Sequence, residues 1–89
     1  MKEVKSSGRF RKDLKRFRNK PDKLEKLYRV VDLLRREEPL PRVYMAHMLE
    51  GAFAGHMECH IEGDLLLIWV DKETIKLVRL GSHAELFGR

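Results

Sequence analysis

Six consecutive apolar residues, Leu65 to Val70, constrain this chain more than any other feature of its sequence. A helix that crosses a membrane needs about 20 apolar residues, so this run is far too short to span one. Because it has no polar face to offer to water, it is predicted to be a central strand that is buried on both faces of a sheet. The rest of the chain must therefore supply its neighbouring strands and its cover.

Two further strands are predicted on either side of this run. Residues 57–62 alternate, with Met57, Cys59 and Ile61 on one side and polar residues, including His60, on the other. Gly63-Asp64 makes a tight reversal into the apolar run. Residues 71–73 form a second turn, and residues 74–80 form the last long strand.

The first 46 residues predict a short strand, two helices and a loop. Residues 2–6 are expected to form the strand, and Ser6-Ser7-Gly8 the entry to the first helix. That helix should end at residues 19–21, since the residue before a proline is disfavoured in a helix. A second helix is expected over residues 22–36, followed by a loop over residues 39–46 that Tyr44 anchors. The expected apolar faces are Phe10, Leu14 and Phe17 in the first helix, and Leu24, Leu27, Tyr28, Val31 and Leu34 in the second.

The order of these elements predicts a single α+β domain over residues 1–89. An N-terminal strand and a two-helix hairpin precede an antiparallel sheet of three to four strands, with the helices on one face. Gly51 and Gly55 bracket a turn before the sheet. The chain has no signal-peptide core, no membrane span and one cysteine, so we expect a cytoplasmic protein.

Charge is distributed unevenly along the chain. Residues 1–36 carry 14 Lys and Arg against five Asp and Glu, whereas residues 37–89 carry five against nine. A basic front half suggests a polyanion partner, most simply RNA or DNA, or an acidic protein. The alternative interpretation is a solvated helix surface.

Histidines are the main candidates for chemistry. His47, His56 and His60 share one 14-residue window, and His83 follows the last strand. Histidine titrates near neutral pH, so two of them can act as base and acid without a cofactor. Asp64 lies just beyond His60 and could orient an imidazole ring. Exposed histidines with no catalytic role are the alternative.

Two further interpretations concern Cys59 and Arg79. Cys59 with His56 and His60 could be zinc ligands, but residues four apart on a strand are about 13 Å apart, and Cys59 faces away from His60. A small core residue is the better interpretation of Cys59. Arg79 could hold a phosphate with two hydrogen bonds, or could pack its stem on an edge strand.

Short motifs follow one another along nearly the whole chain. They are KDLK at 12–15, PLP at 39–41, H-x-L-x-G at 47–51, Gly55, ECHI at 58–61, GDLLLI at 63–68 and RLGSHAELF at 79–87. In this order and spacing, the chain resembles the RelE/ParE toxin superfamily, and within it the YafQ-like toxins of bacterial toxin–antitoxin systems.

This resemblance implies a compact α+β ribonuclease that cleaves mRNA in the ribosomal A site and needs no metal or other cofactor. A ribose 2′-OH would attack the neighbouring phosphate. The implied catalytic residues are His47, His60, Asp64 and His83, and Phe87 matches an aromatic residue that positions the substrate. The implied partners are a cognate antitoxin, the ribosome and mRNA, with no membrane.

Within this implied reaction, specific roles can be proposed. His83 would be the general acid for the leaving 5′ oxygen, and His60 or Asp64 would assist deprotonation of the 2′-OH. His47 would contact the phosphate.

The chain departs from the family pattern at three positions, and other functions stay open. Met48, Met57 and Leu65 stand where the family often has Pro, Arg and Trp. These changes could weaken or alter activity. The first alternative is a non-catalytic interaction protein, either a ParE-like gyrase-binding toxin or an inactive relative that binds an antitoxin. The second is a metal-dependent nuclease or zinc protein, and the third is a generic RNA-binding domain.

Overall fold

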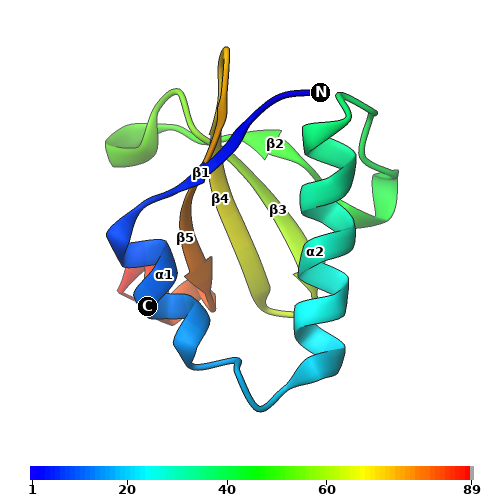
Figure 1. Ribbon diagram of the computed structural model, residues 1–89. Helices are drawn as coiled ribbons and strands as arrows, with labels where there is room; N and C mark the ends of the chain where they lie inside the picture. The colour runs from blue at the N-terminus through cyan, green and yellow to red at the C-terminus, as the bar shows by residue number, and fades with distance from the viewer. Residues whose placement is uncertain (89) are drawn as a thin grey trace.

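Five strands form one sheet in the order β1-β5-β4-β3-β2 (Figure 1). The computed structural model describes residues 1–88. The strands are β1 (Val4–Ser6), β2 (His47–Met48), β3 (Met57–Glu62), β4 (Leu65–Asp71) and β5 (Ile75–Gly81). β1 runs parallel to β5, and the other neighbours are antiparallel. The apolar run therefore lies in the central strand β4, as predicted.

The two faces of β4 bury different residues. Leu65, Leu67 and Trp69 pack in the main core, which the first two helices cover. Leu66 and Ile68 point to the opposite face, where they form a smaller cluster with Leu86. This division follows from the two-residue period of a strand, and it explains why every residue from 65 to 69 is buried.

The helical hairpin consists of α1 (Gly8–Lys15) and α2 (Pro21–Arg35), which lie on one face of the sheet (Figure 1). Ser7 caps α1, because its Oγ accepts a hydrogen bond from the Phe10 N–H at 3.0 Å. α1 ends four residues before the predicted position, and the chain continues through a turn. Phe17 is still buried, so its place in the core does not depend on the helix.

The buried face of α2 differs from the prediction at two positions, because Val30 is buried and Tyr28 is not. Leu27, Val30 and Leu34 are buried at the i, i+3, i+7 spacing of one helical stripe. Tyr28 is 53% exposed, so its assignment to the apolar face was wrong. It follows Leu27 by one residue, which turns its side chain about 100° away from the stripe.

The C-terminal segment forms a helix, α3 (His83–Phe87), on the face opposite α1 and α2. The two helices of the hairpin lie on one face, as predicted, and α3 is an additional helix on the other face that the sequence did not predict. Ser82 and Glu85 form a capping box that begins this helix. Gly81 leaves room for it, since a Cβ there would come within 2.8 Å of Glu85 Oε1.

The segment between α2 and β3 contains the short strand β2, which the sequence did not predict. Two single-turn 3₁₀ helices flank β2, η1 (Arg42–Tyr44) and η2 (Gly51–Phe53). Gly51 and Gly55 have φ angles of 69° and 85°, so the predicted turn uses the left-handed conformation that glycine favours. Tyr44 packs against the core, as predicted for this loop. Within residues 1–88, no helix has the length and apolar character needed to span a bilayer.

Candidate active site

Three of the predicted residues meet where the β3–β4 turn approaches the start of α3. His60 points away from α1 and α2, because it pairs with Leu66 and shares that residue's side of the sheet. Asp64 lies in the turn after β3, and His83 is the first residue of α3. The imidazole rings of His60 and His83 lie 5.9 Å apart between centroids. The fold thus brings together side chains that are up to 23 positions apart in the sequence.

Asp64 holds His83 through two hydrogen bonds to the same oxygen. Its Oδ1 accepts from His83 Nδ1 at 2.6 Å and from the His83 backbone N–H at 3.1 Å. These bonds, helped by the charges of His83 and His60, lower the pKa of Asp64 below its usual value. Asp64 is therefore an ionised acceptor that fixes the ring of His83 and leaves Nε2 free.

His60 is held by a backbone carbonyl rather than by a carboxylate. Its Nδ1 lies 3.3 Å from the Gly63 carbonyl oxygen. A carbonyl can only accept, so Nδ1 carries the proton and Nε2 of the neutral ring has a free lone pair. The Nδ1 atoms of the two rings are thus held by different partners, a backbone carbonyl for His60 and a carboxylate for His83.

His47 reaches the same face of the sheet through β2, where it pairs with Glu58 of β3. His47 Nδ1 lies 2.9 Å from the Met45 carbonyl oxygen, and Nε2 lies 3.3 Å from Glu58 Oε1. Contacts at both ring nitrogens therefore fix the orientation of the imidazole. The structure does not place His47 in direct contact with His83.

Glu58 is a site residue that the sequence interpretation missed. It is 3% exposed, and its Oε2 has no hydrogen-bond partner among the described residues. Glu58 lies two residues before His60 on the same face of β3, which is about 7 Å along the strand. The alternation of residues 57–62 was the available signal, because it put Glu58 and His60 on one side.

Aromatic residues border the histidines. The Phe87 ring lies 6.1 Å from that of His83 and 5.7 Å from that of Phe53. Phe87 is 38% exposed, so it offers an accessible ring beside His83. Phe53 was not predicted. His56 packs edge-on against Phe53 at 5.5 Å, and its Nδ1 faces the Ala54 carbonyl oxygen at 3.4 Å.

Arg79 lies apart from this group, on β5, where it meets Asp13 of α1. Its Nε and Nη2 donate to the two carboxylate oxygens of Asp13 at 2.8 and 3.2 Å. The side chain of Asp13 is 8% exposed and that of Arg79 is 11% exposed. The guanidinium is already engaged in a two-pronged ion pair, so we assign Arg79 a structural role in place of the predicted phosphate contact.

Cys59 is fully buried on the opposite face of β3 from His60. Burial, with a smaller effect of Glu58, raises the pKa of its thiol to about 12. The residue is therefore a neutral core side chain, which agrees with the sequence interpretation. Among residues 1–88, no cluster of three or more His, Cys, Asp or Glu is arranged to hold a metal ion.

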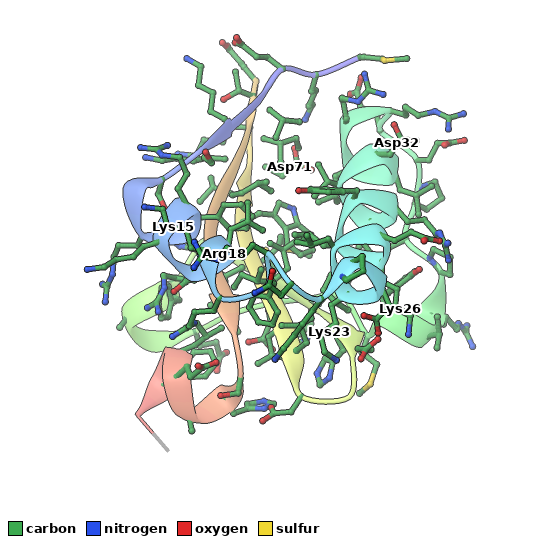
Figure 2. The ribbon with its side chains drawn as sticks, turned by 60° about the horizontal axis from the view of Figure 1, so that its bottom comes forward. Lys15, Arg18, Lys23, Lys26, Asp32 and Asp71 are labelled. Atoms are coloured by element: carbon green, nitrogen blue, oxygen red, sulfur yellow. The ribbon has the colours of Figure 1, made fainter. Side chains whose placement is uncertain are left out.

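Glu62 ends β3 and joins the β3–β4 hairpin to the start of α2. Its carboxylate accepts hydrogen bonds from Lys23, at 2.6 Å, and from Lys26. Figure 2 shows both lysines at the same end of α2. These two bonds lower the pKa of Glu62 to about 2.

Replacing Glu62 by Gln is expected to lower thermal stability at neutral pH and to have little effect near pH 2. The folded-state pKa lies below the ordinary value of 4.5, so the ion pairs stabilise fully above about pH 4.5. Their contribution is lost as the pH falls through about 2. Thermal unfolding across this range measures the difference between the two proteins. Glu73→Gln, in the exposed β4–β5 turn, is the matched control, and a pH-independent difference for Glu62→Gln would contradict the assignment.

Comparison with known proteins supports the resemblance seen in the sequence. Residues 2–88 match the family described as "Bacterial toxin of type II toxin-antitoxin system, YafQ". The mRNA interferase toxin YafQ of Escherichia coli K12 is 34% identical over 89 residues, which cover 98% of this chain and 97% of that protein. A crystal structure of a metal-bound toxin from Helicobacter pylori superposes with a TM-score of 0.89 at 43% identity, covering 98% of this chain and 100% of that one. A chain of the E. coli DinJ–YafQ toxin–antitoxin complex gives 0.87 at 34% identity, covering 98% of each chain.

The fold and these comparisons define a small α+β bacterial toxin, with the compact α+β fold that the resemblance implied. More narrowly, the chain belongs to the YafQ family of toxins of type II toxin–antitoxin systems.

Proposed function

We propose that this chain is a ribosome-dependent mRNA endoribonuclease, the toxin of a toxin–antitoxin pair, which acts in the cytoplasm and is neutralised by a cognate antitoxin. The observation that carries the proposal is the Asp64–His83 pair, whose imidazole lies 5.9 Å from that of His60. Two relatives are named mRNA interferase toxins, and one structural neighbour is a complex with the antitoxin DinJ.

The proposed reaction is an internal transfer of the phosphate. His60 Nε2 takes the proton of the ribose 2′-OH, and the 2′ oxygen forms a bond to the adjacent phosphorus. The bond from phosphorus to the 5′ oxygen breaks, and His83 Nε2 gives its proton to that oxygen. The products are a 2′,3′-cyclic phosphate and a free 5′-OH. Asp64 is engaged by His83, so the base role goes to His60 rather than to Asp64.

His47 and Phe87 are assigned supporting roles. The side chain of His47 is 49% exposed, and Met45 and Glu58 fix its ring. As an imidazolium it would offer a positive charge to the phosphate that receives negative charge in the transition state. Phe87 would stack on a base and so position the strand.

Cut mapping in a reconstituted translation system tests the proposal. Primer extension on a translated mRNA is expected to show discrete cuts in register with codons, present only with ribosomes. His60→Gln should abolish them, and His56→Gln is the matched control that should keep them. Intact mRNA with the wild-type protein, at concentrations where it still binds an antitoxin, would favour the interaction-protein alternative. Loss of cutting on chelation, with ribosomes kept intact, would favour a metal-dependent nuclease.

Ribosome binding is expected to weaken as the salt concentration rises, because α1 carries an exposed set of cations. Figure 2 shows Lys15 at the C-terminal end of this helix and Arg18 in the turn that follows it. Each phosphate contact contributes about 0.9 to the slope of log affinity against log salt. Replacing Lys15 and Arg18 by Gln should therefore reduce this slope by roughly two. Lys72→Gln with Lys76→Gln is the charge-matched control, and equal slopes for both double variants would exclude this surface.

A further inference from the structure

A cavity opens at the edge of β3, next to His60. β2 pairs only with Met57 and Glu58, so the remainder of β3 faces η1 and Met45 instead of a strand. The space between them is a cavity of about 450 Å³. Its lining residues come from α2, from the 43–45 segment and from the end of β3: Lys26, Arg29, Val43, Tyr44, Met45, His60, Ile61, Glu62 and Gly63.

The segment 43–45 gives this cavity an apolar wall that is both exposed and held in place. Val43 is 77% exposed and Met45 is 60% exposed. Tyr44 is half-buried and packs against the main core, so its position is anchored. Met45 has a φ of 53°, in the left-handed region, and its carbonyl oxygen accepts from His47 Nδ1. One residue thus both lines the cavity and orients a histidine of the candidate active site.

Positive charge lines the opposite wall. Lys26 and Arg29 are three residues apart on α2, so they share one face of the helix. Lys26 shares the single carboxylate of Glu62 with Lys23, which leaves one positive charge in excess. Arg29 pairs with Glu25 on the surface, where both side chains are more than half exposed. Such exposed pairs are weak, so a phosphate can replace the carboxylate.

Proteins that bind single-stranded nucleic acid combine aromatic rings with nearby cations. The bases stack on the rings, and the cations neutralise the phosphates. Building on the proposed function, we propose that this cavity holds the nucleotide on the 5′ side of the cleaved bond. Its base lies against Tyr44 and Met45, and the phosphate that precedes it meets Lys26 and Arg29.

The position of His60 sets the direction of the strand. His60 lines the cavity, whereas His83 does not. In the proposed reaction, His60 serves the 2′-OH of the 5′ nucleotide and His83 serves the leaving oxygen of the 3′ nucleotide. The cavity is therefore on the 5′ side, and the 3′ nucleotide lies toward His83 and Phe87.

Cross-linking on programmed ribosomes tests this placement independently of cleavage. The mRNA carries a 2′-deoxy substitution at the cleavage position, which prevents the reaction, and a 4-thiouridine on either its 5′ or its 3′ side. The 5′ probe is expected to cross-link to the peptide that contains residues 43–45, and the 3′ probe to the α3 peptide. Cross-links from the 5′ probe to α3, or from the 3′ probe to residues 43–45, would overturn the proposal.

Variants of Tyr44 provide a second measurement on cleavable mRNA. Tyr44→Leu keeps an apolar anchor but removes the ring, so KM is expected to rise roughly tenfold with little change in kcat. The base preference on the 5′ side should flatten. Tyr44→Phe keeps the ring and should behave as wild type. A folded Tyr44→Leu protein with unchanged KM and unchanged base preference would overturn the proposed 5′ subsite but not the nuclease activity. If the wild-type protein gave the expected cross-links but cut no mRNA, only the proposed nuclease activity would be overturned.

Discussion

Replacing His83 by Ala is expected to slow single-turnover cleavage of ribosome-bound mRNA by roughly 10²- to 10⁴-fold, the usual contribution of one positioned proton donor. Asp64→Asn should cause a smaller loss, because the amide still fits the turn but no longer offers a carboxylate to His83 Nδ1. The variant that carries both changes should be no slower than His83→Ala, since Asp64 acts through the ring that has been removed.

Three measurements make this prediction specific. Rates are compared at saturating toxin, so that weaker ribosome binding does not enter. His56→Gln, a histidine outside the Asp64–His83 pair, should keep a near wild-type rate. Thermal unfolding of each variant shows that it is folded. If the fold losses in rate of the two single variants multiply in the double variant, Asp64 acts on the substrate directly. Its contribution would then not come from orienting His83.

The largest expected loss of stability comes from Asp13→Ala, at about 3 kcal/mol of the free energy of unfolding. Asp13 is 6% exposed and accepts hydrogen bonds from Arg79 and from the Leu80 backbone N–H at 2.9 Å. Its removal leaves the Arg79 guanidinium without the carboxylate and takes the side-chain acceptor from a buried N–H. This costs more than the pair contributes as a whole, because an uncompensated buried charge is costly.

Urea unfolding at neutral pH measures this loss. Asp22→Ala, an exposed aspartate at the start of α2, is the matched control and should lose much less. The variant with both Asp13→Ala and Arg79→Met should recover part of the stability, since it removes the unpaired charge. A double variant less stable than Asp13→Ala would show that Arg79 contributes mainly through the packing of its stem.

The sequence predicted the architecture well where a pattern reports on one element alone. The apolar run predicted β4, and alternation predicted that His60 faces away from the helices, because both signals follow from local geometry. β2 has only two residues, too few for any period to be visible. The helix α3 has five residues, and its place on the far face depends on Leu86 meeting Leu66 and Ile68. Contacts between distant segments cannot be predicted from the periodicity of the local sequence.

The candidate site shows the same division. His60, Asp64 and His83 were predicted, and the structure brings them together. Glu58 was missed because a glutamate on the polar side of a strand is ordinary in sequence, and only its burial beside His47 makes it unusual. The role of Arg79 stayed open between a phosphate contact and a packed stem, because the sequence cannot show that Asp13, 66 residues earlier, is its partner.

The parallel pairing of β1 with β5 has a consequence for how the protein emerges during its synthesis. Val4 is paired with Ile75, and α1 also packs against β5. The first strand and helix therefore have no sheet to join until more than 75 residues have left the translating ribosome. His83 comes later still, so its pair with Asp64 forms only on a nearly finished sheet. On the proposed mechanism, a nascent chain is therefore expected to lack activity until its synthesis is nearly complete.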